Sequence, residues 1–223
     1  MLRIPYETVP LTDDFTIRKE DYFRKNGGII FPNPNAPTGV ELGMQDVEAI
    51  IKANPDGIVV VDEAYVDFGA ASALPLIEKY DNLLVVQTFS KSRGMAGMRI
   101  GYAMGNPVLI KYLNDVKYSF NSYTMDQTTL ALGAAAIADR AYFEETVHKV
   151  VETREWTKKE LENWDLSSEI RKPTLFSLLI RRFRQQNCLQ HSGKPTLSCV
   201  TLRSRELTII CVSRSEHRKI WRN

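Results

Sequence analysis

Short apolar runs alternate with amphipathic stretches over the first two thirds of the chain. The runs at residues 28–31, 57–61 and 83–88 are continuous and end at polar or turn-forming residues, so each is predicted to be a buried strand. Runs of this kind are typical of parallel sheets that are covered on both faces. A fourth strand is expected near residues 98–103.

Helical spacing separates these runs. It predicts a helix over residues 46–53, a short helix over 76–80, and helical structure from 107 to about 162 with an interruption near 119–123. Strands that alternate with helices predict an α/β sheet with right-handed crossovers. Ligands of such sheets collect at the carboxyl ends of the strands.

Composition narrows the class of protein. The chain has 223 residues, 43% of them hydrophobic and 25% charged, which fits a globular protein of one large or two small domains and excludes collagen-like and wholly disordered chains. No apolar run approaches the roughly 20 residues of a membrane span, and no basic-then-apolar leader opens the chain. We therefore expect a cytoplasmic protein without a membrane partner. The net charge of +2 argues against a nucleic-acid partner.

The charge distribution divides the chain in two. Residues 1–163 carry 17 basic and 23 acidic side chains, whereas residues 164–223 carry 12 and 4, together with all three cysteines. Helical and strand periodicity both fail in the second part. A basic arm for nucleic acid or an acidic partner is one interpretation. The cysteines do not have the spacing of zinc ligands.

Lys91 follows the third predicted strand, in a loop of small hydroxyl residues. Desolvation there would favour the neutral amine, which attacks carbonyl groups and forms Schiff bases. Two hydroxyl groups and the cation Arg99 could hold a phosphate. Taken alone, a Ser-Lys pair is more often an exposed lysine in a surface loop.

Asp62 ends the second predicted strand. A carboxylate at the end of a buried strand needs a cationic partner or hydrogen bonds, and a protonated pyridine nitrogen would be such a partner. The alternative is an aspartate that caps a helix. The segment Asn33–Gly39, taken alone, is simply a turn.

Three segments occur together in a definite order: FPNPNAPTG at 31–39, VVVDEAYVDF at 59–68 and TFSKSRGMAGMRIGYAMG at 88–105. The set resembles the class I/II aminotransferase family of fold-type-I pyridoxal-phosphate enzymes, and within it the histidinol-phosphate aminotransferases. The resemblance runs from about Ile4 to Leu161. It implies a partial three-layer α/β/α large domain over 1–163 and an incomplete small domain.

The resemblance also implies roles for individual residues. Lys91 would form the Schiff base with the cofactor and shuttle a proton, Asp62 would pair with the ring nitrogen, and Tyr65 would hydrogen-bond the ring O3′. The cofactor phosphate would be bound by Thr88, Ser90 and Arg99.

One position departs from the family pattern. The family usually places an asparagine immediately before Pro-Thr-Gly as a second O3′ donor, and this chain has Ala36 there. Asn35, one residue earlier, is the candidate substitute.

The implied activity is transamination between histidinol phosphate and 2-oxoglutarate in histidine biosynthesis, by a cytoplasmic homodimer. An aromatic amino acid aminotransferase or a related enzyme is the alternative within the class. A non-enzymatic remnant that at most binds a protein partner is the alternative outside it.

The second part of the chain fits a gene translated one nucleotide out of frame. Codons for Arg205–His217 can be chosen so that the same bases, read in the neighbouring frame, encode the peptide PRIDNYLRISIGT. This peptide resembles the C-terminal part of the same enzymes. The codons GAA-AAA-TTG-GGA encode Glu-Lys-Leu-Gly. Loss of one A changes them to GAA-AAT-TGG-GA, which encodes Glu162, Asn163, Trp164 and the start of Asp165. We therefore expect residues 164–223 to be an out-of-frame, poorly ordered tail, and this polypeptide to be an inactive fragment.

Overall fold

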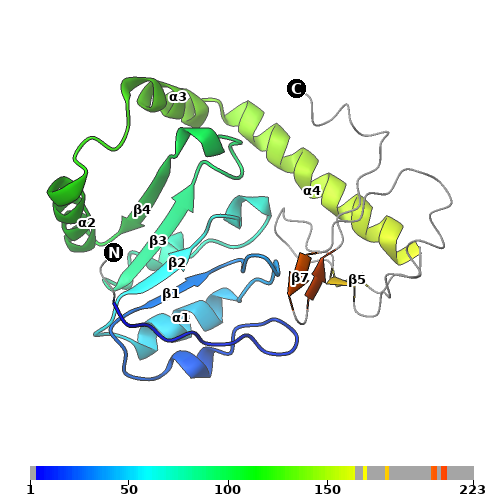
Figure 1. The fold of residues 1–223 in the computed structure, drawn as a ribbon, viewed down its shortest axis with the longest axis horizontal. Coiled ribbons are helices and arrows are strands. Elements are labelled where there is room, and N and C mark those ends of the chain that lie inside the picture. The colour runs from blue at the N-terminus through cyan, green and yellow to red at the C-terminus, as the bar shows by residue number, and fades with distance from the viewer. Residues whose placement is uncertain (1–3, 164–167, 170–178, 181–201, 205–206, 210–223) are drawn as a thin grey trace.

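The structure, a computed structural model, describes residues 4–163 and four two- or three-residue strands beyond them (Figure 1). Its main sheet has four strands in the order β1-β2-β3-β4. Their bounds are β1 (Ile29–Pro32), β2 (Val59–Asp62), β3 (Leu83–Thr88) and β4 (Gly101–Gly105). The first three strands run parallel, which confirms that part of the prediction.

The fourth strand corrects the prediction in two ways. It begins at Gly101 instead of residue 98, and it pairs with β3 in the antiparallel sense. The loop between β3 and β4 holds a 3₁₀ turn, η4 (Ala96–Met98), and Arg99 with a left-handed φ of 55°. Parallel strands are usually joined by an α-helical crossover, and the loop over 89–100 forms no α-helix.

Two helical features also differ from the pattern-based expectation. The predicted helix over 76–80 is wrong, because the segment overlaps only the last residue of a 3₁₀ turn, η3 (Leu74–Leu76), and residues 77–79 form a non-helical turn. A segment this short cannot offset the cost of nucleating an α-helix.

The long helical region is broken twice. Its helices are α2 (Pro107–Phe120), α3 (Gln127–Ala138) and α4 (Arg140–Asn163).

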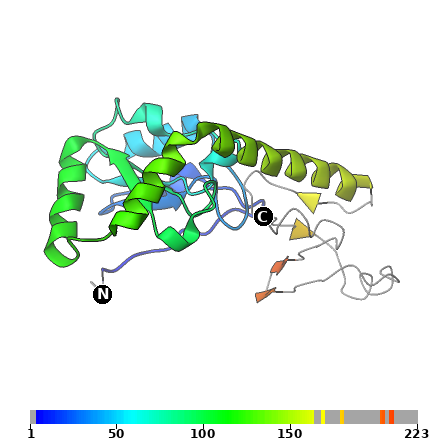
Figure 2. The same cartoon turned by 90° about the horizontal axis from the view of Figure 1, so that it is seen from above.

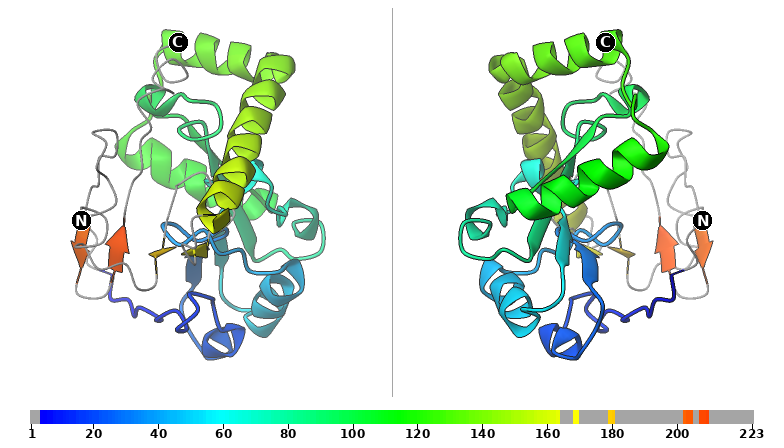
Figure 3. Two further views of the ribbon diagram at one scale, coloured as in Figure 1. Left: turned by 90° about the vertical axis from the view of Figure 1, so that its right-hand side faces the viewer. Right: turned by 90° about the vertical axis from the view of Figure 1, so that its left-hand side faces the viewer.

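The best-packed core lies between one face of the sheet and α1 (Met44–Ala53). Val47, Ile50 and Ile51 of α1 are almost fully buried there, as expected for an amphipathic helix that covers a sheet. On the opposite face, Ile30 is 73% exposed. Figures 2 and 3 show the same ribbon from above and from its two sides.

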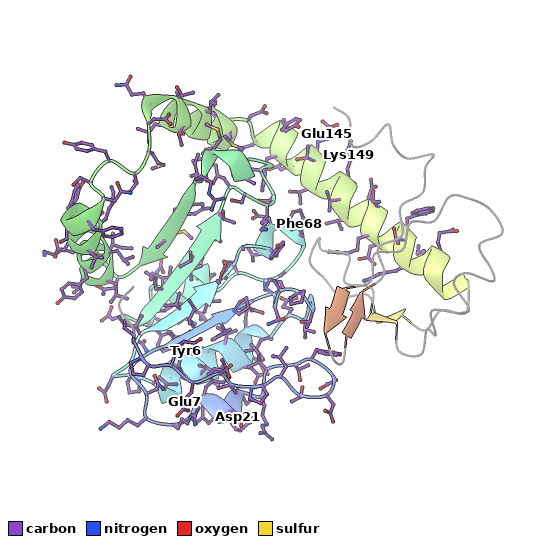
Figure 4. All side chains as sticks on the ribbon, viewed as in Figure 1. Tyr6, Glu7, Asp21, Phe68, Glu145 and Lys149 are labelled. Carbon is purple, nitrogen blue, oxygen red and sulfur yellow. The ribbon has the colours of Figure 1, made fainter. Side chains whose placement is uncertain are left out.

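The helix α4 runs past the carboxyl ends of the parallel strands (Figure 1). It contacts η2 (Val66–Phe68), the turn that follows β2. Buried Arg154 donates from Nη1 to the carbonyl of Phe68 at 2.8 Å, and Figure 4 labels Phe68 on the α4 side of the strands. The remaining short turn, η1 (Lys19–Tyr22), packs against α1.

Beyond α4, the described strands form a small antiparallel sheet in the order β5-β6-β8-β7. Their bounds are β5 (Ser168–Glu169), β6 (Leu179–Ile180), β7 (Leu202–Ser204) and β8 (Leu207–Ile209). The other positions of 164–223 lie outside the described residues, so the expectation of a poorly ordered tail stays a prediction. Within the described part, no helix has the combination of length and apolarity that crossing a membrane requires.

Candidate cofactor site

The loops after the three parallel strands begin side by side. Asp62 pairs with Pro32 on one side and with Val86 on the other. Beyond the paired residues, the N–H of Asn33 donates to the carbonyl of Asp62 at 2.8 Å, and the N–H of Glu63 donates to the carbonyl of Val86 at 2.8 Å. The sheet therefore brings the three sequence motifs together at its carboxyl edge, where ligands of α/β proteins collect.

Lys91 and Tyr65 face each other across this edge. The Lys91 Nζ lies 5.1 Å from the centroid of the Tyr65 ring, within the range of a cation–π contact. Tyr65 is buried, whereas Lys91 is exposed. The expectation that this amine is desolvated is therefore wrong: it is exposed beside the tyrosine ring and accessible to a small molecule.

Asp62 stands half-buried at the end of β2. Its Oδ1 accepts the N–H of Ala64 at 3.0 Å, so the carboxylate does cap the turn that follows the strand. Among the described residues no hydrogen bond is assigned to Oδ2. One carboxylate oxygen therefore holds the loop, and the other is available to a cationic partner.

Two hydroxyl groups lie together at the end of β3. The Oγ1 of Thr88 is 3.0 Å from the Oγ of Ser90, accepts the Ser90 N–H at 3.1 Å, and lies 3.1 Å from the carbonyl of Ile100. The Ser90 N–H thus holds the loop, and the two adjacent hydroxyls are the groups that can donate to a phosphate.

Arg99 and Asn35 form hydrogen bonds within their own loops. Arg99 donates from Nη1 to the carbonyl of Ala96 at 3.0 Å and is exposed. The Oδ1 of Asn35 accepts from Thr38 Oγ1 at 2.7 Å, and Ala36 is exposed. The structure thus brings Lys91 to Tyr65 and places the hydroxyls of Thr88 and Ser90 together. The side chains of Arg99 and Asn35 instead form hydrogen bonds within their own loops.

Sequence patterns did not single out Glu63, which is 1% exposed. Its carboxylate accepts from Ser72 Oγ at 2.7 Å, from the Ala73 N–H at 2.6 Å and from Gln87 Nε2 at 2.8 Å. Glu63 continues the alternation of Val59 and Val61 toward the core, and a carboxylate on that face requires hydrogen bonds. Strand alternation was therefore the signal that could have found it.

Gln87 extends this network to β4. Its Oε1 accepts from the Tyr102 hydroxyl at 2.6 Å. Burial raises the pKa of Tyr102, and the negative charge of Asp67 raises it further. The Tyr102 hydroxyl therefore stays protonated at neutral pH and remains a donor to Gln87.

Comparison with known proteins assigns the class. Residues 2–192 match the family model "Aminotransferase class I and II", and the chain belongs to this family, which depends on pyridoxal phosphate. Within the family, the chain is 58% identical over 159 residues to a histidinol-phosphate aminotransferase of Pseudomonas syringae and 52% identical over 161 residues to one of Lactococcus lactis. These alignments cover 71% and 72% of this chain and 45% of each relative, so the chain spans about half the length of the curated relatives it matches.

A solved structure confirms the α/β fold class. The histidinol-phosphate aminotransferase of Sinorhizobium meliloti, in complex with pyridoxal-5′-phosphate, superimposes with a TM-score of 0.65 at 28% identity. The superposition covers 75% of this chain and 47% of that chain. The expectation of a partial large domain of this fold agrees with that coverage.

The residues at the sheet edge fit pyridoxal phosphate. The cofactor presents an aldehyde, a basic ring nitrogen and a phosphate. The site offers an accessible amine on Lys91, an available carboxylate oxygen on Asp62, and the hydroxyl pair of Thr88 and Ser90. Each chemical group of the cofactor thus has a partner of the matching kind at the same sheet edge.

Proposed function

We propose that this chain carries the cofactor site of an aminotransferase that acts on histidinol phosphate with 2-oxoglutarate, in histidine biosynthesis. The observation that carries the proposal is the contact of the Lys91 amine with the Tyr65 ring, beside Asp62, at the carboxyl edge of the sheet. The substrate assignment is supported by the identity to relatives named histidinol-phosphate aminotransferase.

Pyridoxal phosphate, when bound, supplies an electron-accepting ring that stabilises negative charge on the α-carbon of an amino acid. In this proposal, the Lys91 amine would hold the cofactor at its carbonyl carbon, with loss of water, until the substrate amine displaces it. The freed amine would then move the proton that leaves the substrate carbon. The Oδ2 of Asp62 holds a proton on the ring nitrogen, and the Tyr65 hydroxyl donates to the ring oxygen.

The other proposed contacts fix the cofactor in the site. The hydroxyls of Thr88 and Ser90 and the guanidinium of Arg99, a bidentate donor to phosphates, would hold its phosphate. Asn35 keeps its Oδ1 on Thr38 and donates from Nδ2 to the ring oxygen. Anchoring at the phosphate leaves the reacting carbon oriented toward Lys91, which lowers the entropic cost of reaction.

The proposal extends to the assembly and to this particular polypeptide. We propose a cytoplasmic homodimer for the intact enzyme, and no turnover by the 223-residue polypeptide alone. The recoded LRISIG string contains an arginine whose codon is split between Cys211 and Val212 in the printed frame. In the enzymes that the chain resembles, this arginine binds the anionic end of the substrate.

Covalent capture tests the cofactor site. The chain is incubated with pyridoxal phosphate and reduced with borohydride, and the modified lysine is located by peptide mass spectrometry. We expect the pyridoxyl group on Lys91, its absence from that peptide in Lys91→Ala, and unchanged capture in Lys111→Ala. Lys111 is the matched control because it is an exposed lysine in an i,i+4 pair on α2. Labelling spread evenly over surface lysines would overturn the proposal.

A further inference from the structure

The loop that carries Lys91 is tied to the turn that carries Tyr65. Ser92, the residue after Lys91, is buried, and its Oγ donates to the carboxylate of Asp67 in η2. Tyr65 is the N-terminal capping residue of that same turn. A single side-chain hydrogen bond therefore joins the backbone beside Lys91 to the backbone beside its ring partner.

The next residue, Arg93, is held by a different element, the helix α3. Its Nη1 donates to the carbonyl of Ala136 in the last turn of α3 at 2.6 Å, where a cation also interacts favourably with the helix dipole. Its guanidinium stacks over the rings of Phe89 at 5.2 Å and Phe143 at 4.2 Å. The loop is thus anchored through Ser92 and Arg93, while Lys91 itself is exposed.

Anchoring of the loop through Ser92 and Arg93 limits where the Lys91 amine can reach. A lysine side chain has four flexible carbons, so its reaction rate with a bound aldehyde depends on where its backbone is held. Asp67 is exposed, and an exposed aspartate needs no partner for its own solvation. Its hydrogen bond serves the buried Ser92 hydroxyl, which would otherwise lose its acceptor.

We propose that Asp67 is a positioning residue that holds Lys91 in reach of the cofactor through the hydroxyl of Ser92. The proposal rests on the proposed function, because it assumes that Lys91 is the residue that binds the cofactor. It assigns no contact between Asp67 and the cofactor.

The test compares capture rates at Lys91 in the full 223-residue chain. The variants are Asp67→Ala, Ser92→Ala, the double variant and Asp67→Asn, which keeps an oxygen acceptor. We expect each alanine variant to be captured about fivefold more slowly, the effect of one net hydrogen bond of roughly 1 kcal/mol. The double variant should be no slower than either single one, because both remove the same bond. Asp67→Asn should retain most of the wild-type rate.

Two further measurements separate positioning from general destabilisation. Asp81→Ala is the matched control, since Asp81 is an exposed aspartate that accepts from Asn106 near the opposite end of β3. Without cofactor, trypsin should cleave after Lys91 and Arg93 faster in Asp67→Ala than in the wild type, with cleavage at other sites unchanged. A uniform increase at all sites would show a merely structural role and overturn the inference.

The outcomes also distinguish this inference from the proposed function. Equal rates of capture at Lys91 in the wild type, Asp67→Ala and Ser92→Ala would overturn the positioning role. This result would still support Lys91 as the residue that binds the cofactor. Failure of the wild-type chain to be captured at Lys91 would overturn both.

Discussion

Asn33 binds the main chain of Leu42 through both ends of its side-chain amide. Its Nδ2 donates to the Leu42 carbonyl at 3.1 Å, and its Oδ1 accepts the Leu42 N–H at 2.8 Å. The Asn33 side chain is fully buried, and its own main-chain N–H donates to the carbonyl of Asp62. A segment whose sequence indicates a simple turn is therefore closed by a buried amide and attached to the end of β2.

Replacing this amide should destabilise the fold. Asn33→Ala leaves the buried N–H and carbonyl of Leu42 without partners, which should lower the free energy of unfolding by about 2–4 kcal/mol. Urea unfolding followed by circular dichroism measures the loss. Asn121→Ala, at an exposed position after α2, is the control and should change stability by less than about 0.5 kcal/mol. Equal stabilities of the two variants would contradict the prediction.

Gly105 at the end of β4 should not tolerate a side chain. A Cβ at this position would lie 2.8 Å from the carbonyl oxygen of Leu83, and a main-chain atom cannot easily move away. We expect Gly105→Ala to lower the melting temperature, with a cost of about 1–3 kcal/mol. Gly97→Ala is the matched control, because nothing lies within 4 Å of its Cβ. Equal melting temperatures for Gly105→Ala and Gly97→Ala would contradict the prediction.

The contact between Tyr80 and Glu48 predicts a dependence of stability on pH. The Tyr80 hydroxyl donates to Glu48 Oε1 at 2.7 Å and lowers the pKa of that carboxyl below its ordinary value. A depressed pKa stabilises the fold above the unfolded-state pKa of about 4.3, and this contribution is lost as the pH falls through the folded-state pKa. The stability difference between wild type and Tyr80→Phe should therefore be largest near pH 6 and shrink below about pH 4.

Unfolding curves at several pH values measure this difference. Tyr118→Phe serves as the control, because Tyr118 is an exposed tyrosine on α2. A difference between wild type and Tyr80→Phe that stays constant from pH 6 to pH 3 would contradict the linkage.

The frame hypothesis predicts a DNA sequence and a gain of activity. Restoring one base before the Trp164 codon should open a continuous frame through LRISIGT. A full-length, frame-corrected parent should then turn over histidinol phosphate, whereas the 223-residue polypeptide should show no measurable turnover, since loss of a bidentate anion contact worth several kcal/mol by itself costs roughly 10²–10⁴-fold in rate. An early stop codon in the restored frame, or robust turnover by the short polypeptide, would refute the hypothesis.

Much of the fold could be predicted from the sequence, because apolar periodicity is a local property of the chain. The third strand lies over residues 83–88 as predicted, and β1 and β2 begin within two residues of their predicted starts. The order and spacing of the three motifs were enough to indicate the family. The positions of Asp62 at the end of β2 and of Lys91 in the loop after β3 also followed from the pattern, since the buried apolar runs mark where the strands end.

Tertiary structure decided what depends on residues far apart in the chain. The antiparallel sense of β4 follows from a connection that holds a 3₁₀ turn and no crossover helix. The partners of Glu63, and the bond between Asp67 and Ser92, join residues up to 25 positions apart. Periodicity records which positions are buried, whereas the partner of a buried polar group is set by which strands lie side by side. The sequence alone therefore determined the family and predicted the chemical groups of the candidate site, and the folded sheet decided which of those groups meet.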